Sequence, residues 1–326
     1  MQALDLTPRY LCRGVITYPL GVHCGAVGSN PPDGEILDGL RRAVECGATL
    51  LDTADWYGCG RAERLIGRLL RERSDQPLLL SSKVGRLQGS APHPYADRHI
   101  HHQFEQSLEN LYAEHLDLYF LDSFDFGQGD RYLGGAIDQM VTLRELGLVK
   151  AIGMRGPYTD YGSSSAERQV IAERFLYLFR LIRPNVVWMR FDPLIPAVQI
   201  DGENLFDFTR RHRLGLVLAA PQVPGAPIRS FATRSLEAIA SELRFLREHF
   251  GDPPGMLTRL ALRSCLQRAD HCAAVFGLAS GAQVEENFAC LGAPLTDAEL
   301  TVIDEIYARI RDRLHEAAHR PIQVEA

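Results

Sequence analysis

The sequence predicts an α/β protein of the (β/α)8 or TIM barrel class, with an N-terminal hairpin and a C-terminal helix. Eight short apolar runs of strand type are mostly separated by helical patterns, which is more than a typical small doubly wound sheet contains. No linker divides these runs, and 326 residues are enough for one such barrel with insertions. We therefore expect a single domain over residues 1–326.

The elements can be placed in chain order. Residues 10–18 indicate a small hairpin or cap, followed by a first strand within 19–25. A helix over 35–46 has apolar residues at helical spacing, and Gly47 ends it. An insertion over 222–252 follows the seventh strand, and a capped terminal helix runs from about 295 to 314. The further expected strands are 49–51, 78–84, 116–124, 149–154, 186–191, 215–219 and 273–278, and the further helices are 61–71, 100–111 and 135–146.

The most informative stretch is 49–63, which reads T-L-L-D-T-A-D-W-Y-G-C-G-R-A-E. Asp52 ends a strand here, Tyr57 lies just beyond it, and Lys83 is near the carboxyl end of the strand over 78–84. If the two strands are parallel neighbours, the three side chains converge. Paired with Asp52, Lys83 stays cationic, and we expect its charge to lower the pKa of Tyr57 toward the range of a proton donor.

Further polar residues are expected at the same end of the barrel. Asp122, Arg155, Arg190 and Gln222 all fall at or just past strand ends, where barrels of this kind have their chemistry. Arginine makes bidentate contacts with carboxylates and phosphates, so Arg155 and Arg190 are candidates to bind a substrate phosphate or a cofactor pyrophosphate. Ion pairing with Asp122 or Asp192 is the structural alternative.

Composition points to a small-molecule partner. A net charge of -6 provides no electrostatic footprint for nucleic acid or an anionic membrane, and no apolar run approaches the roughly 18 residues of a membrane span. The seven cysteines are odd in number and lack C-x-x-C spacing, which favours neither disulfides nor zinc and suggests the cytoplasm. The histidines at 93, 99, 101 and 102 lack ligand spacing, so we expect no metal site.

Taken in order, these motifs resemble the aldo-keto reductase superfamily. The resemblance covers nearly the whole chain and includes L-L-D-T-A-D-W-Y-G, the lysine strand over 78–85, V-K-A-I-G-M-R over 149–155, and A-V-F-G-L-A-S-G-A-Q-V-E-E-N over 274–287. It implies a (β/α)8 barrel, NADP(H), and hydride transfer to or from a carbonyl. It also implies that Tyr57 is the general acid, that Lys83 tunes it, and that Asp52 is the partner of Lys83.

The resemblance also suggests cofactor contacts. Its last segment implies that the adenosine end is bound near a helix start suited to a phosphate. The nicotinamide side departs from the family: Arg155-Gly156 replaces a serine-asparagine pair, Trp188 a glutamine, and Ala220-Pro221 a serine-proline pair. The expected cofactor-binding residues are Arg155, Trp188, Gln222, Gly277, Ser280, Gln283, Glu286 and Asn287.

Asp122 occupies the place where the family usually has a histidine. Held neutral in an apolar pocket, it could donate a hydrogen bond to a substrate oxygen and polarise a conjugated carbonyl. Ionised beside Lys83, it would oppose negative charge on that oxygen and better serve as a base or as an acceptor for a sugar hydroxyl. The sequence leaves both forms open.

The leading hypothesis is an NADP(H)-dependent oxidoreductase of the aldo-keto reductase type with an altered active site. Its substrate would be a small polar carbonyl or enone, such as a sugar or a secondary-metabolism intermediate. The rebuilt nicotinamide side keeps two alternatives open: a non-redox step such as elimination or epimerisation on the same barrel, and a non-catalytic NADP-binding regulatory protein. We expect a monomer or a weak homo-oligomer.

Overall fold

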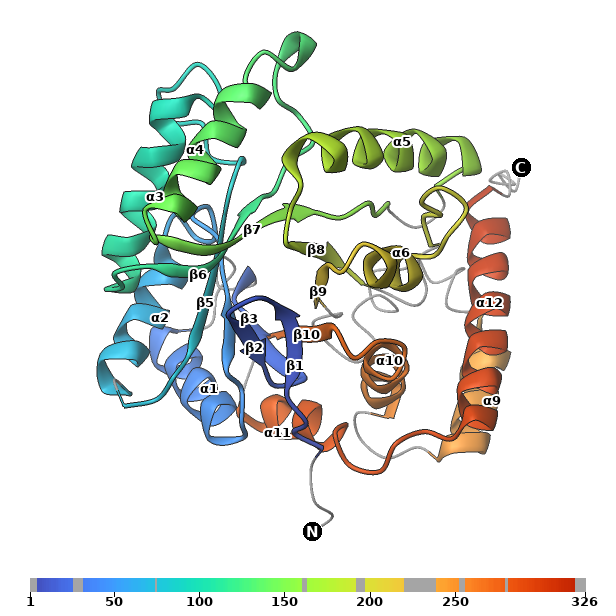
Figure 1. Ribbon diagram of the computed structural model, residues 1–326. Helices are drawn as coiled ribbons and strands as arrows, with labels where there is room; N and C mark the ends of the chain where they lie inside the picture. Colours follow the sequence, from blue (N-terminus) through green and yellow to red (C-terminus); the bar gives the residue numbers. More distant parts are fainter. Residues whose placement is uncertain are drawn as a thin grey trace, which may run out of the picture.

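The computed structural model describes residues 5–25, 32–73, 75–159, 163–191, 197–219, 239–251, 256–278 and 281–319. Eight strands close into a parallel barrel in the order β10-β3-β4-β5-β6-β7-β8-β9, with β9 paired to β10 (Figure 1). The predicted TIM barrel is therefore confirmed. The barrel strands are β3 (Leu20–His23), β4 (Leu50–Asp52), β5 (Leu79–Val84), β6 (Leu116–Leu121), β7 (Val149–Arg155), β8 (Val186–Arg190), β9 (Gly215–Ala219) and β10 (Cys272–Gly277).

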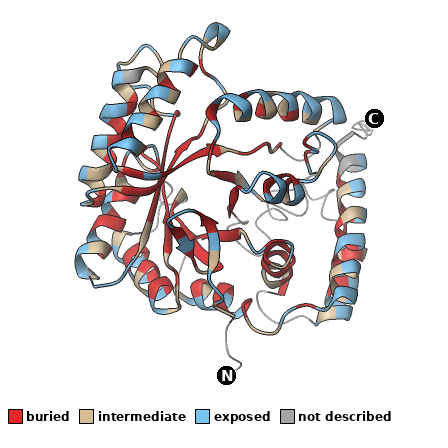
Figure 2. Cartoon of the chain, viewed as in Figure 1, coloured by how far each residue is buried: buried red, intermediate tan, exposed pale blue. Residues whose placement is uncertain are grey.

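Helices surround the barrel and pack on it through one face. In α2, the buried side chains Ala62, Leu65, Ile66 and Leu69 recur at the spacing of a single helix face. Figure 2 shows the result, with buried strands at the centre and helices exposed on their outer side. The helices are α1 (Asp33–Glu45), α2 (Arg61–Glu72), α3 (Asp97–Leu111), α4 (Leu133–Glu145), α5 (Ser165–Ile182), α6 (Leu205–Arg211), α9 (Ala240–Phe250), α10 (Met256–Leu266), α11 (Gly281–Ala289) and α12 (Asp297–His319).

Helices α5, α6, α9, α10 and α11 lie in intervals for which the sequence patterns gave no helix bounds. Helix α5 starts at a capping box, in which Ser164 Oγ accepts from the Glu167 amide and the Glu167 carboxylate accepts from the Ser164 amide. Helix α10 precedes β10 and packs with α9 and α12 in a separate apolar cluster. None of the helices in the described ranges is long and apolar enough to cross a bilayer.

The predicted N-terminal hairpin closes one end of the barrel. It consists of β1 (Arg9–Cys12) and β2 (Val15–Thr17), which pair antiparallel. Leu11, Cys12 and Val15 are buried in one cluster with inward side chains of the barrel strands. The hairpin therefore fills the amino-terminal end, and the carboxyl ends of the strands form the opposite end, which we call the mouth.

Strand β6 ends earlier than the predicted 116–124. After Leu121, the amide of Ser123 donates to the Tyr95 hydroxyl at 2.7 Å instead of to a neighbouring strand, and that hydroxyl donates to the Ser123 carbonyl at 3.1 Å. Tyr95 also lies against Gly85, where an added Cβ would be 2.2 Å from the Tyr95 hydroxyl and φ is +117°. Glycine is required at this turn, which starts the segment after β5.

Candidate active site

The carboxylate of Asp52 is the centre of a buried polar cluster at the mouth. Asp52 is the last residue of β4, and Lys83 Nζ donates to both of its oxygens at 2.8 Å. Lys83 Nζ also donates to the backbone carbonyl of Thr53 at 2.6 Å. Because β4 and β5 are parallel neighbours, the predicted convergence of Asp52 and Lys83 follows from the register of the sheet.

Three more side chains contact this carboxylate. Ser81 Oγ donates to Asp52 Oδ1 at 2.6 Å, and Trp188 Nε1 donates to Oδ2 at 3.1 Å. His23 Nδ1 lies 2.7 Å from Oδ2, and because an ionised carboxylate only accepts, the Nδ1 nitrogen is the donor. Burial alone would raise the pKa of Asp52, but Lys83 and His23 hold it at about 2. Asp52 is therefore ionised near neutral pH and compensates the charge of Lys83.

Tyr57 lies next to this cluster as predicted. The centroid of its ring is 5.4 Å from Lys83 Nζ, and its ring meets His23 edge to face at 5.3 Å between centroids. The Trp56 ring also meets it edge to face, 4.3 Å away between centroids. The phenol is thus held among aromatic rings beside the ammonium group.

The expected direction of the Tyr57 pKa is wrong. Burial raises the pKa of Tyr57, and the carboxyl groups of Asp52 and Asp122 raise it further. The expectation treated Lys83 as an uncompensated cation, whereas Asp52 neutralises it at 2.8 Å. Tyr57 therefore keeps its proton near neutral pH, as a general acid must before the reaction.

Asp122 follows β6 and is buried at the mouth. Burial raises its pKa, although Lys83, Arg86 and Arg155 each lower it. Arg86 Nε donates to Asp122 Oδ2 at 3.3 Å, and the Arg86 side chain is 41% exposed, so water screens this pair. Burial is the largest of these effects, and it acts toward the neutral acid, whereas the three cations act toward the ionised form.

A second buried acid, Asp55, lies near the same cluster. Among the described residues, neither oxygen of Asp55 has a hydrogen-bond partner. Burial and the neighbouring carboxyl group of Glu63 raise the pKa of Asp55 to about 8, outweighing the opposite effect of Lys83. Asp55 is therefore protonated at neutral pH in the folded chain.

The substitution Asp55→Asn tests this protonation. The usual pKa is 3.8, so between about pH 4 and pH 8 the folded chain retains a proton that the unfolded chain has lost. The free energy of unfolding then falls as the pH rises, by at most about 1.4 kcal/mol per pH unit from this group. The free energies of unfolding of Asp55→Asn and the parent should be measured with urea at pH 5 and at pH 8. The variant should gain stability relative to the parent between pH 5 and pH 8. The control is Asp125→Asn, at an exposed position. If the free energy of unfolding changes equally with pH in the parent and in Asp55→Asn, Asp55 is not protonated in the folded chain.

The expected cofactor residues occupy two parts of the mouth. Gly277 ends β10, and Gln283, Glu286 and Asn287 lie on α11 at the i, i+3, i+4 spacing of one helix face. Arg155 instead ends β7, and Trp188 is on β8, inside the barrel with its indole bonded to Asp52. Gln222 and Ser280 lie outside the described residues. The structure thus separates Arg155 from the α11 group.

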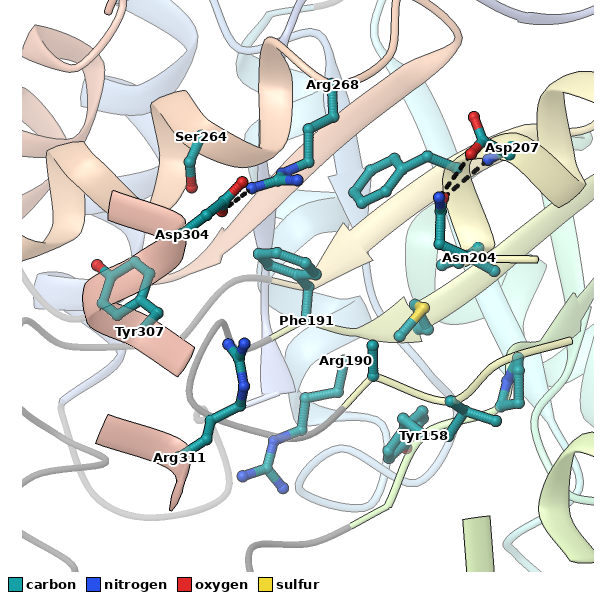
Figure 3. Close-up of a pocket in the computed structure, with 16 residues that line it drawn as sticks. Tyr158, Arg190, Phe191, Asn204, Asp207, Ser264, Arg268, Asp304, Tyr307 and Arg311 are labelled. Carbon is teal, nitrogen blue, oxygen red and sulfur yellow. Dashed lines mark hydrogen bonds and ion pairs between the residues drawn. The ribbon is translucent and has the colours of Figure 1, made fainter. Parts of the chain in front are cut away.

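A cavity of about 520 Å³ adjoins the site at Tyr158 and Arg190. Figure 3 shows Arg190 and Arg311 among the residues that line it, and the ion pair between Arg268 and Asp304 farther along. Tyr158 connects the cavity with the acid–base cluster, because its ring centroid is 6.4 Å from that of Trp188. The cavity therefore begins where the predicted catalytic residues lie.

The sequence patterns missed several residues of this site. His23 is the last residue of the first barrel strand, in L-G-V-H, and Arg86 comes three residues after Lys83, so both positions near strand ends were available as signals. Asp55 and Tyr158 lie in loops, where no periodicity indicates burial. Among the described residues, no group of three or more histidine, cysteine, aspartate or glutamate side chains could hold a metal ion.

An ammonium–carboxylate pair beside a protonated phenol, all at the mouth of a (β/α)8 barrel, defines a class of barrel enzymes with an acid–base centre. The sequence model of the aldo/keto reductase family matches residues 22–308, so this chain belongs to the aldo/keto reductase family. It is therefore an NAD(P)H-dependent oxidoreductase of that family, which confirms the prediction of an enzyme.

Individual relatives are distant. L-galactose dehydrogenase from Arabidopsis thaliana is 22% identical over 84% of this chain and 82% of its own length. NADH-specific methylglyoxal reductase from Escherichia coli is 22% identical over 88% of this chain and 94% of its own. Among solved structures, glycerol dehydrogenase from Gluconobacter oxydans is similar with a TM-score of 0.72 and 18% identity, covering 99% of both chains. At this identity, the structural likeness establishes the fold alone.

Proposed function

We propose that this protein is an NADP(H)-dependent reductase with an altered active site that acts on a small polar carbonyl or enone compound. A sugar or a secondary-metabolism intermediate is the expected kind of substrate. The observation that carries the proposal is the convergence of Asp52, Lys83 and Tyr57, with the Tyr57 ring 5.4 Å from a buried ammonium group. The named relatives act on a sugar and on a small dicarbonyl compound, which supports this substrate class.

Each member of the cluster has a separate task. Asp52 holds Lys83 Nζ through both of its oxygens, and Lys83 provides positive potential beside the ring of Tyr57. Tyr57 holds its proton until negative charge develops on the substrate oxygen and then donates it. In the opposite direction, the phenolate would take the proton back from the alcohol.

Asp122 is proposed to orient the substrate from the other side of the mouth. With its pKa raised by burial, it can donate a hydrogen bond to the same oxygen as Tyr57 or to a neighbouring one. A neutral carboxyl group does not repel a developing oxyanion, which an ionised one would. This role marks the site as altered relative to the family pattern that the sequence resembles.

The residues present fit a dinucleotide cofactor at the β10–α11 side. Gln283, Glu286 and Asn287 present amide and carboxylate groups on one face of α11, which suits the hydroxyl groups and the base of an adenosine. The start of α11 suits a phosphate because its first amides have no partner within the helix. When bound, the nicotinamide supplies or accepts the hydride.

A fluorescence titration with NADPH and NADH tests the cofactor. We expect NADPH to bind about 10-fold more tightly than NADH, since one charge-assisted contact to the additional phosphate is enough for that difference. Carbonyl or enone compounds should then oxidise bound NADPH. Binding of neither nucleotide contradicts the proposal, and a preference for NADH would limit it to NAD(H).

The compartment and the assembly state are also proposed. All seven cysteines are free, which is consistent with a reducing cytoplasm. A monomer or a weak homo-oligomer remains our expectation for the assembly.

A further inference from the structure

Two guanidinium groups lie on either side of the Asp122 carboxyl group. Arg86 follows β5 and Arg155 ends β7, while Asp122 follows β6, which pairs with both of these strands. Arg86 Nε donates to Asp122 Oδ2 at 3.3 Å, and both arginines act electrostatically on this carboxyl group. Two cations therefore share one acidic group, and that group is buried.

Aromatic rings hold both guanidinium groups in place. The Arg155 guanidinium carbon lies 4.0 Å from the centroid of the Tyr158 ring and 5.6 Å from that of Phe124. The Arg86 guanidinium carbon lies 5.9 Å from the centroid of Trp56. A guanidinium group stacked on a ring can still use its N–H edge for a planar anion. In the part of the chain that the structure describes, no carboxylate lies within ion-pair distance of Arg155.

This pair of arginines lies close to the proton donor. Arg86 lies 5.9 Å from the centroid of Trp56, whose ring is 4.3 Å from that of Tyr57 between centroids. Tyr158, on which Arg155 stacks, lies 6.4 Å between centroids from Trp188, whose indole donates to Asp52. The α11 group lies elsewhere, because β8 and β9 separate β7 from β10 on one side of the barrel and four strands separate them on the other. Arg155 is therefore better placed for the substrate than for the adenosine end of a cofactor.

We propose that Arg86 and Arg155 form an anion subsite that binds a carboxylate or phosphate group on the carbonyl substrate. The inference rests on the proposed function and names its substrate class: a carbonyl compound with an anionic group a few bonds from the carbonyl carbon. The anion would balance the two guanidinium charges, and its position would fix the carbonyl oxygen near Tyr57.

Matched substrates test the subsite by turnover. With NADPH, kcat/KM should be at least about 10-fold higher for succinic semialdehyde than for its methyl ester, or for glyceraldehyde 3-phosphate than for glyceraldehyde. The first preference identifies a carboxylate and the second a phosphate. Arg155→Met should lower kcat/KM for the preferred anionic substrate by about 10- to 100-fold, through a higher KM. For the matched neutral substrate, kcat/KM should change less than about 3-fold.

The control is Arg41→Met, a half-buried residue of α1 that pairs with Glu72 on the outside of the barrel. This substitution should leave kcat/KM for all four substrates unchanged. An equal loss for charged and neutral substrates in Arg155→Met overturns the proposal. So does a weakened affinity for NADPH with the charge preference intact, which would assign Arg155 to the cofactor.

A binding measurement separates this proposal from the proposed function. The two tryptophans of the chain are Trp56 and Trp188, and both lie at the site, so intrinsic fluorescence reports on it. Succinate should quench this fluorescence in the parent at lower concentration than succinamide, and Arg86→Met and Arg155→Met should abolish the difference. If no carbonyl compound is reduced but succinate binding depends on both arginines, the reductase proposal fails and the subsite stands. If carbonyl compounds are reduced but succinate and succinamide quench the fluorescence equally, the anion subsite is wrong and the reductase proposal stands.

Discussion

Replacing Tyr57 by phenylalanine is expected to lower kcat by about 10³-fold, and by at least 10², because the substitution removes the proton that the substrate oxygen receives. Cofactor affinity should change less than about 3-fold, since phenylalanine preserves the ring that packs against His23 and Trp56. Single-turnover oxidation of NADPH and an equilibrium titration measure the two quantities separately.

The control for this substitution is Tyr10→Phe on the exposed face of the hairpin, at the opposite end of the barrel. It should leave turnover unchanged. Activity of Tyr57→Phe within a few-fold of the parent would remove Tyr57 from the acid role. His23, whose ring meets Tyr57 and whose Nδ1 is fixed by Asp52, would then be the next candidate for the proton donor.

Breaking the buried ion pair should have the largest effect on stability. Lys83→Met is expected to lower the free energy of unfolding by about 3–5 kcal/mol, because the ionised Asp52 would remain buried without its cation. The double substitution Asp52→Leu and Lys83→Met removes both charges and should be less destabilised than the sum of the single substitutions. We expect a coupling energy of about 1–3 kcal/mol from urea unfolding.

The solvent-accessible pair of Arg41 and Glu72 provides the comparison. Its atoms are also 2.8 Å apart, but Arg41→Met should cost less than about 1 kcal/mol, because water screens both partners. Additive effects of Asp52→Leu and Lys83→Met would mean that the buried contact contributes nothing specific. In that case the tuning of Tyr57 by Lys83 would lose its structural support.

Most of the architecture was accessible from the sequence. Apolar runs and helical spacing identified the barrel, and the rule that parallel strands end at one mouth brought Asp52, Lys83 and Asp122 together before any coordinates. These residues are at strand ends, where position along the chain determines position in space.

The features of the site that the sequence did not predict depend on contacts across the barrel. Trp188 is 136 residues from Asp52, and nothing in the local sequence indicates that its indole nitrogen donates to that carboxylate. The direction of the Tyr57 pKa was wrong for a related reason: residue types show which charges exist, but the net effect depends on burial and on which charges compensate each other. Asp55 was missed because its position in a loop predicts exposure, whereas the fold buries it.

The hairpin at the amino-terminal end has a kinetic consequence. Leu11, Cys12 and Val15 fill that end, so in the part of the chain that the structure describes, solutes reach the acid–base centre from the mouth. Where the cofactor binds deeper at this entrance than the substrate does, the cofactor must arrive first and depart last. Initial-rate and product-inhibition patterns should therefore indicate a compulsory order instead of random addition.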